Sequence, residues 1–176
     1  MSHDNFSKNR NLSEEQTIVG SSFAKYLDGK ILLGAVEYAD LPGLHLFNVQ
    51  VRVDTGANNS SLHVENIEYE ERDNETWVSF DLPKDVFPDR RASRRSAKLI
   101  DKRLVKTNNE AKEKRCLIEA SVCIGKSHWT IPITLTDRSN MRYPMLLGRT
   151  AMAGRALVDP ESEYIQSEDR MSVNYE

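Results

Sequence analysis

Cysteine is scarce in this sequence, and no apolar run approaches the length of a membrane span. A transmembrane helix needs about 20 consecutive apolar residues, and the N-terminus lacks the basic and apolar regions of a secretory signal. We therefore predict a cytoplasmic protein without membrane contact.

The two cysteines, Cys116 and Cys123, lie seven residues apart in a strand-like segment. Their side chains should point to opposite faces, so no disulfide is expected between them.

An excess of positive charge is also absent. The 176 residues carry a formal net charge of −3 and a sequence pI near 5.9, which argues against nucleic-acid binding as the purpose of the whole chain. The length favours one domain that can bury a core. Residues 1–27 and 168–176 are polar and without periodicity, so we predict a flexible arm and a loose tail around a domain at 28–167.

What the sequence does contain is strand signal. Short runs rich in Val, Ile, Thr and aromatic residues are separated by turn residues, which predicts an all-β domain that is closed or sandwich-like. The clearest feature is a hairpin around Gly125-Lys126, whose two arms alternate apolar and polar residues. A short helix is expected at 149–154, followed by closing strands at 156–158 and 163–165. The predicted strands before it are KILLGAV (30–36), LHLFNVQVRVD (44–54), ETWVSFDL (75–82), KRCLIEASVCIG (114–125) and SHWTIPITLT (127–136).

A basic segment at 83–106 stands apart, with seven arginines and lysines between Arg90 and Arg103. One interpretation is a solvated loop or mobile insertion that forms a lid. The other is a patch that attracts an acidic peptide, a ribosomal surface or another polyanion. RNA binding would rest on these arginines alone.

Asp54 ends an alternating strand and is followed by Thr-Gly-Ala. Asp-Thr-Gly is compatible with an ordinary Asx-type turn. Its position at the end of an apolar strand also allows a catalytic carboxylate, because two such groups that share one proton form an acid/base pair. A single Asp-Thr-Gly occurs, so a second carboxylate would have to come from a second chain related by two-fold symmetry.

The order VRVDTGA, then a hairpin ending in ITLTDRSNMRYP, then MLLGRTAM resembles retropepsin-like aspartic peptidases. LLGAVEYADLPGL, VDTGANNSSLH and RYPMLLGRTAMAGRALVDPESEYI are similar to the RimB-like branch, associated with the glutamate ligase RimK, over residues 31–166. The resemblance implies a closed β-barrel with one short helix after LLGR, and a homodimer with Asp54 as the catalytic residue. It also implies supporting roles for Thr55, Gly56, Ala57, Leu146, Leu147, Gly148 and Arg149, and substrate contacts for Asn58, Asn59 and His63.

This chain departs from the retropepsin pattern after the loop. Viral retropepsins follow Asp-Thr-Gly-Ala with an acid that pairs with the arginine after the second glycine, whereas Asn58 and Asn59 stand here. Arg149 should therefore bind a backbone carbonyl or Asp137. Residues 57–124 contain no glycine, so the glycine-rich flap of the viral enzymes is missing and the basic segment takes its place in the sequence.

The family is often labelled an ATP-dependent zinc protease, but the residues do not support either group. There is no His-Glu-x-x-His, no paired Cys-x-x-Cys and no Walker loop. His63, Cys116, Cys123 and His128 are scattered, so we predict no metal and no cofactor.

The expected function is peptide-bond hydrolysis by a homodimer that acts on a peptide or protein. Its rival is a non-hydrolytic partner or regulator of a RimK-type glutamate ligase system, which keeps the fold and binds a protein in its groove.

Overall fold

The computed structural model describes residues 25–87, 94–106 and 112–167. The predicted arm up to residue 24, the tail from 168, and Arg90 and Arg91 lie outside these ranges. Within them, strands dominate. The elements are β1 (Tyr26–Leu27), β2 (Lys30–Leu33), β3 (Val36–Leu41), a 3-10 turn (Pro42–Leu44), β4 (Leu46–Asp54), β5 (Ser60–His63), β6 (Glu65–Arg72), β7 (Glu75–Asp81), β8 (Arg94–Lys98), β9 (Asp101–Lys106), β10 (Lys112–Ile124), β11 (Ser127–Thr136), β12 (Met145–Gly148), α1 (Arg149–Met152) and β13 (Ala156–Val158).

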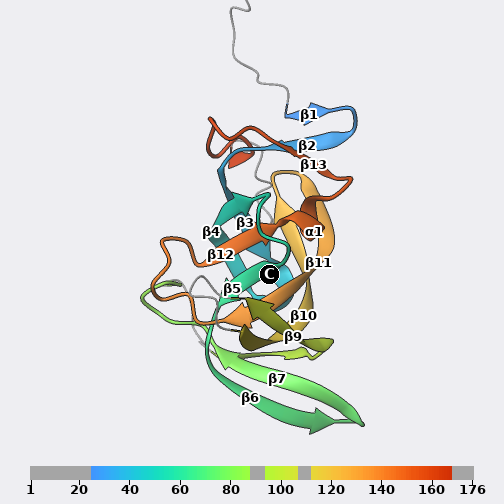
Figure 1. Ribbon diagram of the computed structural model, residues 1–176, viewed down its shortest axis with the longest axis vertical. Helices are drawn as coiled ribbons and strands as arrows, with labels where there is room; N and C mark the ends of the chain where they lie inside the picture. Colours follow the sequence, from blue (N-terminus) through green and yellow to red (C-terminus); the bar gives the residue numbers. More distant parts are fainter. Residues whose placement is uncertain (1–24, 88–93, 107–111, 168–176) are drawn as a thin grey trace, which may run out of the picture.

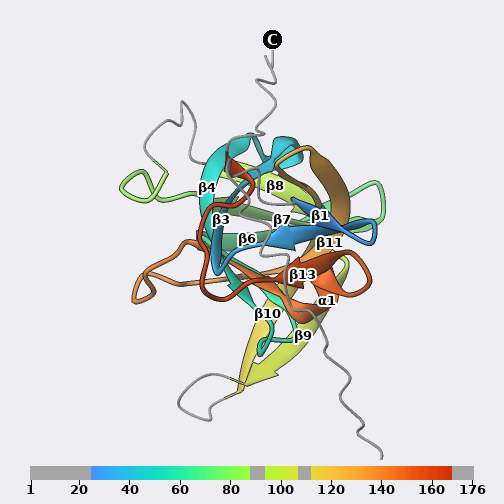
Figure 2. The same cartoon turned by 90° about the horizontal axis from the view of Figure 1, so that it is seen from above.

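Six of the strands close into a barrel, which confirms the predicted fold class (Figure 1). The sheet order is β11-β5-β12-β4-β3-β10-β9, and β10 also pairs with β11 to close the ring. The predicted hairpin around Gly125 supplies this closing pair over nine residue pairs, from Cys116↔Leu135 to Ile124↔Ser127. Viewed from above, β9 and the first part of β10 project from the barrel as a second hairpin (Figure 2).

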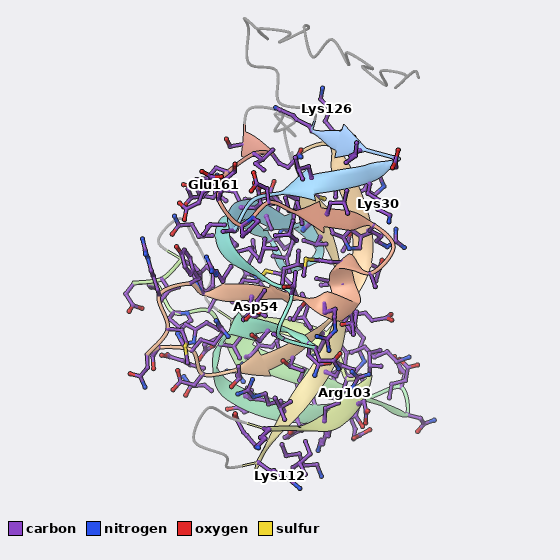
Figure 3. The ribbon with its side chains drawn as sticks, turned by 45° about the horizontal axis from the view of Figure 1, so that its top comes forward. Lys30, Asp54, Arg103, Lys112, Lys126 and Glu161 are labelled. Carbon is purple, nitrogen blue, oxygen red and sulfur yellow. The ribbon has the colours of Figure 1, made fainter. Side chains whose placement is uncertain are left out.

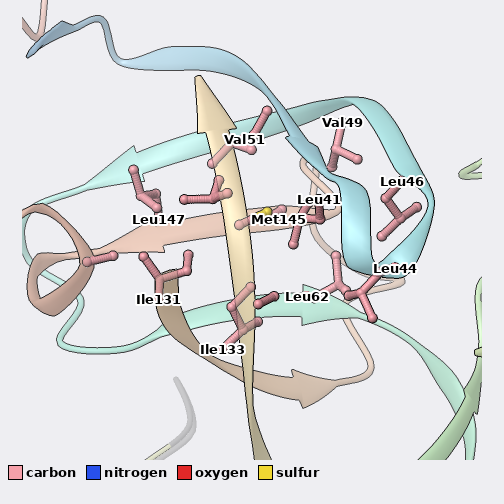
Figure 4. Close-up of a cluster of buried hydrophobic side chains, with 14 of the residues drawn as sticks. Leu41, Leu44, Leu46, Val49, Val51, Leu62, Ile131, Ile133, Met145 and Leu147 are labelled. Atoms are coloured by element: carbon pink, nitrogen blue, oxygen red, sulfur yellow. The ribbon is translucent and has the colours of Figure 1, made fainter. Parts of the chain in front are cut away.

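The barrel interior is filled by side chains that alternate along the strands. Val49, Val51 and Val53 of β4 are buried, and the intervening residues are not. The predicted apolar faces of β10 and β11 are buried in the same way. Figure 4 shows Val51 of β4, Leu62 of β5, and Met145 and Leu147 of β12 converging from three strands. Burial of each such side chain contributes about 1.5–3 kcal/mol, so the core fixes the strands that carry the Asp54 loop.

Two smaller sheets lie at opposite ends of the barrel (Figure 1). One consists of β1, β2 and β13. The other consists of β6, β7 and β8, whose tight turn at Asp73-Asn74 has positive φ at both residues, as a hairpin turn of this type requires. The inner side of β7 carries Val78 and Phe80 into the core.

The closing strand predicted at Glu163–Ile165 is wrong. Tyr164 has φ of 57°, which interrupts an extended strand. The backbone N–H of Tyr164 donates to the carbonyl of Val36, and that of Ile165 donates to the carboxylate of the buried Glu37. Residues 163–165 are therefore attached to the barrel by individual hydrogen bonds and do not form a β-ladder with a neighbouring strand. The predicted arm also ends too late, because Tyr26 and Leu27 form β1.

The interpretation of the basic segment as a solvated loop is also wrong where the structure describes it. Arg94–Lys98 forms β8 and Asp101–Lys106 forms β9. Arg94 pairs with Glu68 and Asp81, and Lys98 pairs with Glu75. Cross-strand ion pairs can hold a strand that has no apolar alternation, and for this reason the apolar pattern of the sequence does not indicate β6 and β8.

Two expectations from composition can be compared with the structure. Cys116 and Cys123 are both free thiols, as predicted. Across the described ranges, no helix combines the length and the apolarity that a bilayer crossing demands.

Candidate active site

Asp54 is the last residue of β4 and lies at the centre of the molecule, between the end marked by Lys30 and the hairpin marked by Arg103 (Figure 3). Its Oδ1 accepts hydrogen bonds from the backbone N–H of Gly56 at 2.9 Å and of Ala57 at 3.1 Å. The carboxylate is partly buried, whereas Thr55 and Gly56 are exposed. The loop therefore fixes one carboxylate oxygen through its own backbone.

β12 passes between β4 and β5 and supports this loop. It runs parallel to β4, with Leu147 opposite Val53 and Gly148 opposite Asp54, and antiparallel to β5. The N–H of Gly148 donates to Ser60 Oγ at 3.1 Å. A Cβ on Gly148 would collide with the backbone carbonyl of Asn59. Only glycine lets the two backbones approach this closely.

α1 is joined to the loop by a further set of bonds. The N–H of Arg149 donates to the carbonyl of Ala57 at 2.7 Å, and its guanidinium donates to the carbonyl of Thr55 at 3.1 Å. The N–H and hydroxyl of Thr150 both donate to the carbonyl of Asn58. Of the two partners expected for Arg149, the structure shows the backbone carbonyl. No bond between the Thr55 hydroxyl and the Asp54 carboxylate appears in the described part of the chain.

Asp137, the other expected partner, belongs to a different group. Its Oδ1 lies 3.6 Å from Nδ1 of His63 and accepts the N–H of Ser139. The bonds from Ser139, with attraction by His63 as a smaller cause, lower the pKa of the Asp137 carboxyl. His63 is buried, and its Nδ1 accepts the N–H of Arg138 at 2.8 Å. His63 lies at the far end of β5 from the loop.

Arg52 lies two residues before Asp54 on β4 and therefore shares its face of the sheet. Leu146 of β12 lies opposite both Arg52 and Ser61 in the strand register. Along this face, an exposed guanidinium, an aliphatic side chain and the catalytic candidate are neighbours. The alternation in QVRVD could have predicted the position of Arg52, which sequence analysis overlooked.

Arg138 was also missed, and no sequence motif marks it. Its Nη1 donates to Ser61 Oγ at 2.8 Å and its Nε donates to the carbonyl of Tyr143 at 3.3 Å. Burial lowers the pKa of the guanidinium, repulsion by Arg115 lowers it further, and attraction by the Asp54 carboxylate raises it. Arg138 therefore lies within electrostatic reach of Asp54, and the acceptors that it contacts among the described residues are neutral.

Asn58 and Asn59 have structural contacts in this chain. The carbonyl of Asn58 accepts the bonds from Thr150, and Asn59 Oδ1 accepts a bond from Arg103 Nη1 at 3.0 Å. Because Arg103 is on β9, the second bond connects the projecting hairpin to the Asp54 loop.

The candidate zinc ligands do not converge. Cys116 Sγ is 3.1 Å from the hydroxyl of Tyr69, and His63 Nδ1 is occupied by Arg138. Cys123 lies opposite His128 across the β10–β11 hairpin, with no third ligand arranged around them. In the part of the chain that the structure describes, no three His, Cys, Asp or Glu side chains could hold a metal together. The described residues therefore do not fit a zinc centre.

Comparison with known proteins relates this arrangement to one family. The family described as "Retropepsin-like aspartic endopeptidase RimB" matches residues 32–169. Among solved structures, the crystal structure of Lpg0085 from Legionella pneumophila, a protein of unknown function (DUF785), aligns with a TM-score of 0.61 and 29% identity. The alignment covers 76% of this chain and 95% of that chain.

Curated relatives carry the name "Probable alpha-L-glutamate ligase". The one from Shewanella pealeana is 38% identical over 141 residues, and the one from Parasynechococcus marenigrum is 41% identical over 135 residues. These alignments cover 80% and 77% of this chain but 31% and 29% of the relatives, so the chain spans less than a third of their length. The match over residues 32–169, together with the barrel and the Asp54 loop, shows that the chain belongs to the RimB-like family of retropepsin-like aspartic endopeptidases.

Proposed function

We propose that this protein is an aspartic peptidase whose active site is completed by a second copy of the chain. The observation that carries the proposal is the Asp54 loop, in which two backbone N–H groups hold the carboxylate and Gly148 lies opposite it in the sheet. Each chain supplies one such loop. A two-fold rotation would bring two Asp54 carboxylates together, and the exposed Thr55 and Gly56 provide a surface that this pairing would cover.

The chemistry follows from the shared proton. Two carboxylates about 3 Å apart cannot both ionise, so one stays protonated. The ionised Asp54 takes a proton from water, which attacks the scissile carbonyl, while the protonated Asp54 donates a hydrogen bond to the carbonyl oxygen. The N–H groups of Gly56 and Ala57 orient Oδ1 of each carboxylate for this exchange.

We further propose that the substrate is a peptide that carries glutamate residues. Relatives that contain a similar region are named for glutamate ligation, and a peptide containing glutamate is what such a ligase would produce. The face around Asp54 suits this substrate, because Arg52 shares the face of Asp54 and the guanidinium of Arg138 contacts only neutral acceptors among the described residues.

The test is cleavage of a hexaglutamate peptide by the purified protein, followed by mass spectrometry. Asp54→Asn should reduce the rate by about a thousandfold or more, because general acid/base catalysis depends on this carboxyl. Thermal melting and the mass in solution should stay unchanged, since Asn keeps the shape of the side chain. Cleavage that persists in the Asp54→Asn variant would rule out the proposed role.

The rival function is a non-hydrolytic partner of a glutamate ligase. The observation that favours it is the single aspartate loop per chain, which has no mate in a monomer. The mass in solution discriminates between the two. A dimer that cleaves at acidic to neutral pH and is blocked by a statine-type inhibitor supports the peptidase, whereas a monomer that binds but does not cleave supports the regulator.

A further inference from the structure

A pocket of about 450 Å³ opens on the barrel, and no residue of the Asp54 loop lines it. Its volume lies within the range of small-ligand sites. Its walls come from β3, β4 and β5 and from the segments around Phe87 and Arg138. Its polar and charged lining includes Tyr38, Gln50, His63, Asp85, Arg138 and Arg142.

The pocket lies on the same face of the barrel as Asp54. Gln50, Arg52 and Asp54 alternate along β4, so their side chains share one face. Tyr38 is opposite Gln50 in the sheet. At about 3.3 Å per residue, the four residues from Gln50 to Asp54 correspond to about 13 Å. An extended peptide with its scissile bond at Asp54 would cover this distance with about four residues.

The lining favours a negatively charged group. Arg138 and Arg142 contribute two guanidinium groups, and Asp85 is the one carboxylate that the lining contains among the described residues. His63 Nδ1 accepts a hydrogen bond, so in the neutral imidazole the proton is on Nε2, which is then a donor.

Arg138 is the strongest sign of a missing anion. Its guanidinium is partly buried, and the bonds that it makes go to a hydroxyl and a carbonyl. No carboxylate of the described chain lies within ion-pair distance of it. A partly desolvated cation that makes no direct ion pair is unfavourable, and a bound carboxylate would relieve more of this cost than the attraction by Asp54 does.

We propose that this pocket binds a carboxylate group of a ligand through Arg138 and Arg142, at a site separate from the Asp54 dyad. The carboxylate has two sources with the same chemistry: a peptide whose cleaved bond lies at Asp54, or a free small acid such as glutamate. The first source rests on the proposed peptidase function, and the second does not.

Binding is measured on the Asp54→Asn protein, which does not consume the probe, so the result is independent of whether the wild type cleaves. The probes are fluorescein-labelled hexaglutamate with a free C-terminus, the same peptide with a C-terminal amide, labelled hexaglutamine with a C-terminal amide, whose peptide carries no carboxylate, and free L-glutamate. Each is titrated against the parent protein and against a version that also carries Arg142→Gln. Arg142 is exposed and its cation–π contact is with the adjacent Tyr143, so this change should not affect folding.

The matched control is Arg155→Gln, which removes one exposed positive charge outside the pocket. Arg142→Gln should weaken the binding of at least one carboxylate probe fivefold or more relative to Arg155→Gln, and it should leave hexaglutamine unchanged. A difference between the free and amidated peptides assigns the site to a chain terminus. An equal effect on both assigns it to glutamate side chains, and an effect on free glutamate alone assigns it to a small acid.

The proposal is overturned if Arg142→Gln and Arg155→Gln weaken binding equally, since this would reflect overall charge. It is also overturned if no carboxylate probe binds more tightly than hexaglutamine. Arg138→Lys provides a second variant, because it keeps the charge but loses the planar fork. Arg138→Lys should weaken the binding of the carboxylate probes while leaving the melting temperature of the protein nearly unchanged.

Discussion

The Asp54 loop and the β6–β7–β8 sheet are stabilised in opposite ways. The loop is held by backbone groups: the N–H groups of Gly56 and Ala57 on the carboxylate, and the bonds from Arg149 and Thr150 to loop carbonyls. The sheet is held by charged side chains, with cross-strand pairs such as Arg94 with Glu68 and Lys98 with Glu75. Backbone contacts tolerate little change, whereas exposed ion pairs contribute about 0–1 kcal/mol each.

The arginines of the two regions differ in the same way. Arg72 and Arg94 of the outer sheet contact carboxylates, so their charge is neutralised within the protein. Arg138 and Arg149 near Asp54 contact hydroxyl or carbonyl oxygens instead. The charge of the outer sheet is thus neutralised within the protein, while under the proposed function the charge near Asp54 would bind an anionic substrate.

The largest expected effect is a loss of stability when the close backbone contact between Gly148 and Asn59 is disrupted. Gly148→Ala should destabilise the protein by about 3 kcal/mol or more, because the new Cβ meets the backbone of Asn59 and neither strand can move freely. Chemical denaturation measures the loss. Gly43→Ala is the matched control, since nothing lies within 4 Å of a Cβ there. Equal midpoints for the two variants would contradict the close approach of β12 to the loop.

The next largest effect should distinguish the substitution of Arg138 from that of Arg94. Arg138→Gln should lower kcat/KM for a glutamate peptide by about tenfold to a hundredfold, because it removes a charge-assisted contact with the substrate. Arg94→Gln should leave cleavage unchanged and cost about 0.5 kcal/mol of stability, as expected for exposed pairs. Peptide cleavage and chemical denaturation are measured on both variants. A loss of activity in Arg94→Gln equal to that in Arg138→Gln would remove the distinction between the two regions.

The sequence could predict the parts of the molecule that depend on apolar alternation and on short motifs. The hairpin around Gly125 and the helix at Arg149 were recognised from such patterns, and the barrel was implied by the family resemblance. In the outer sheet, β7 was recognised from its apolar residues, but β6 and β8 were not, because Glu65–Arg72 and Arg94–Lys98 pair through charged side chains on other strands. Arg138 could not be predicted either, since its relation to Ser61 and Asp54 arises only when β5 and β11 lie side by side.

The smallest expected effect is on the loss of stability at acidic pH. A hydrogen bond from Asn66, and then the contacts with Arg94, lower the pKa of the Asp81 carboxyl below its ordinary value of 3.8. Bonds from Ser79 and Arg72 lower the pKa of Glu70 below its ordinary value of 4.5. Folded-state pKa values below those of the unfolded chain mean that these carboxylates stabilise the fold above about pH 5. The stabilisation is lost as the pH falls through 4.5 and 3.8 toward the folded-state values.

Asp81→Asn should therefore flatten the fall in melting temperature between pH 5 and pH 3, and its destabilising effect should shrink as the pH falls toward the lowered folded-state pKa of Asp81. Asp28→Asn, in the exposed turn between β1 and β2, is the control and should keep the wild-type slope. If Asp81→Asn keeps that slope as well, the ion pairs of the outer sheet do not contribute measurably to its stability. The sheet would then depend on Val78 and Phe80 in the core, and the contrast with the backbone-held loop would be one of packing rather than of charge.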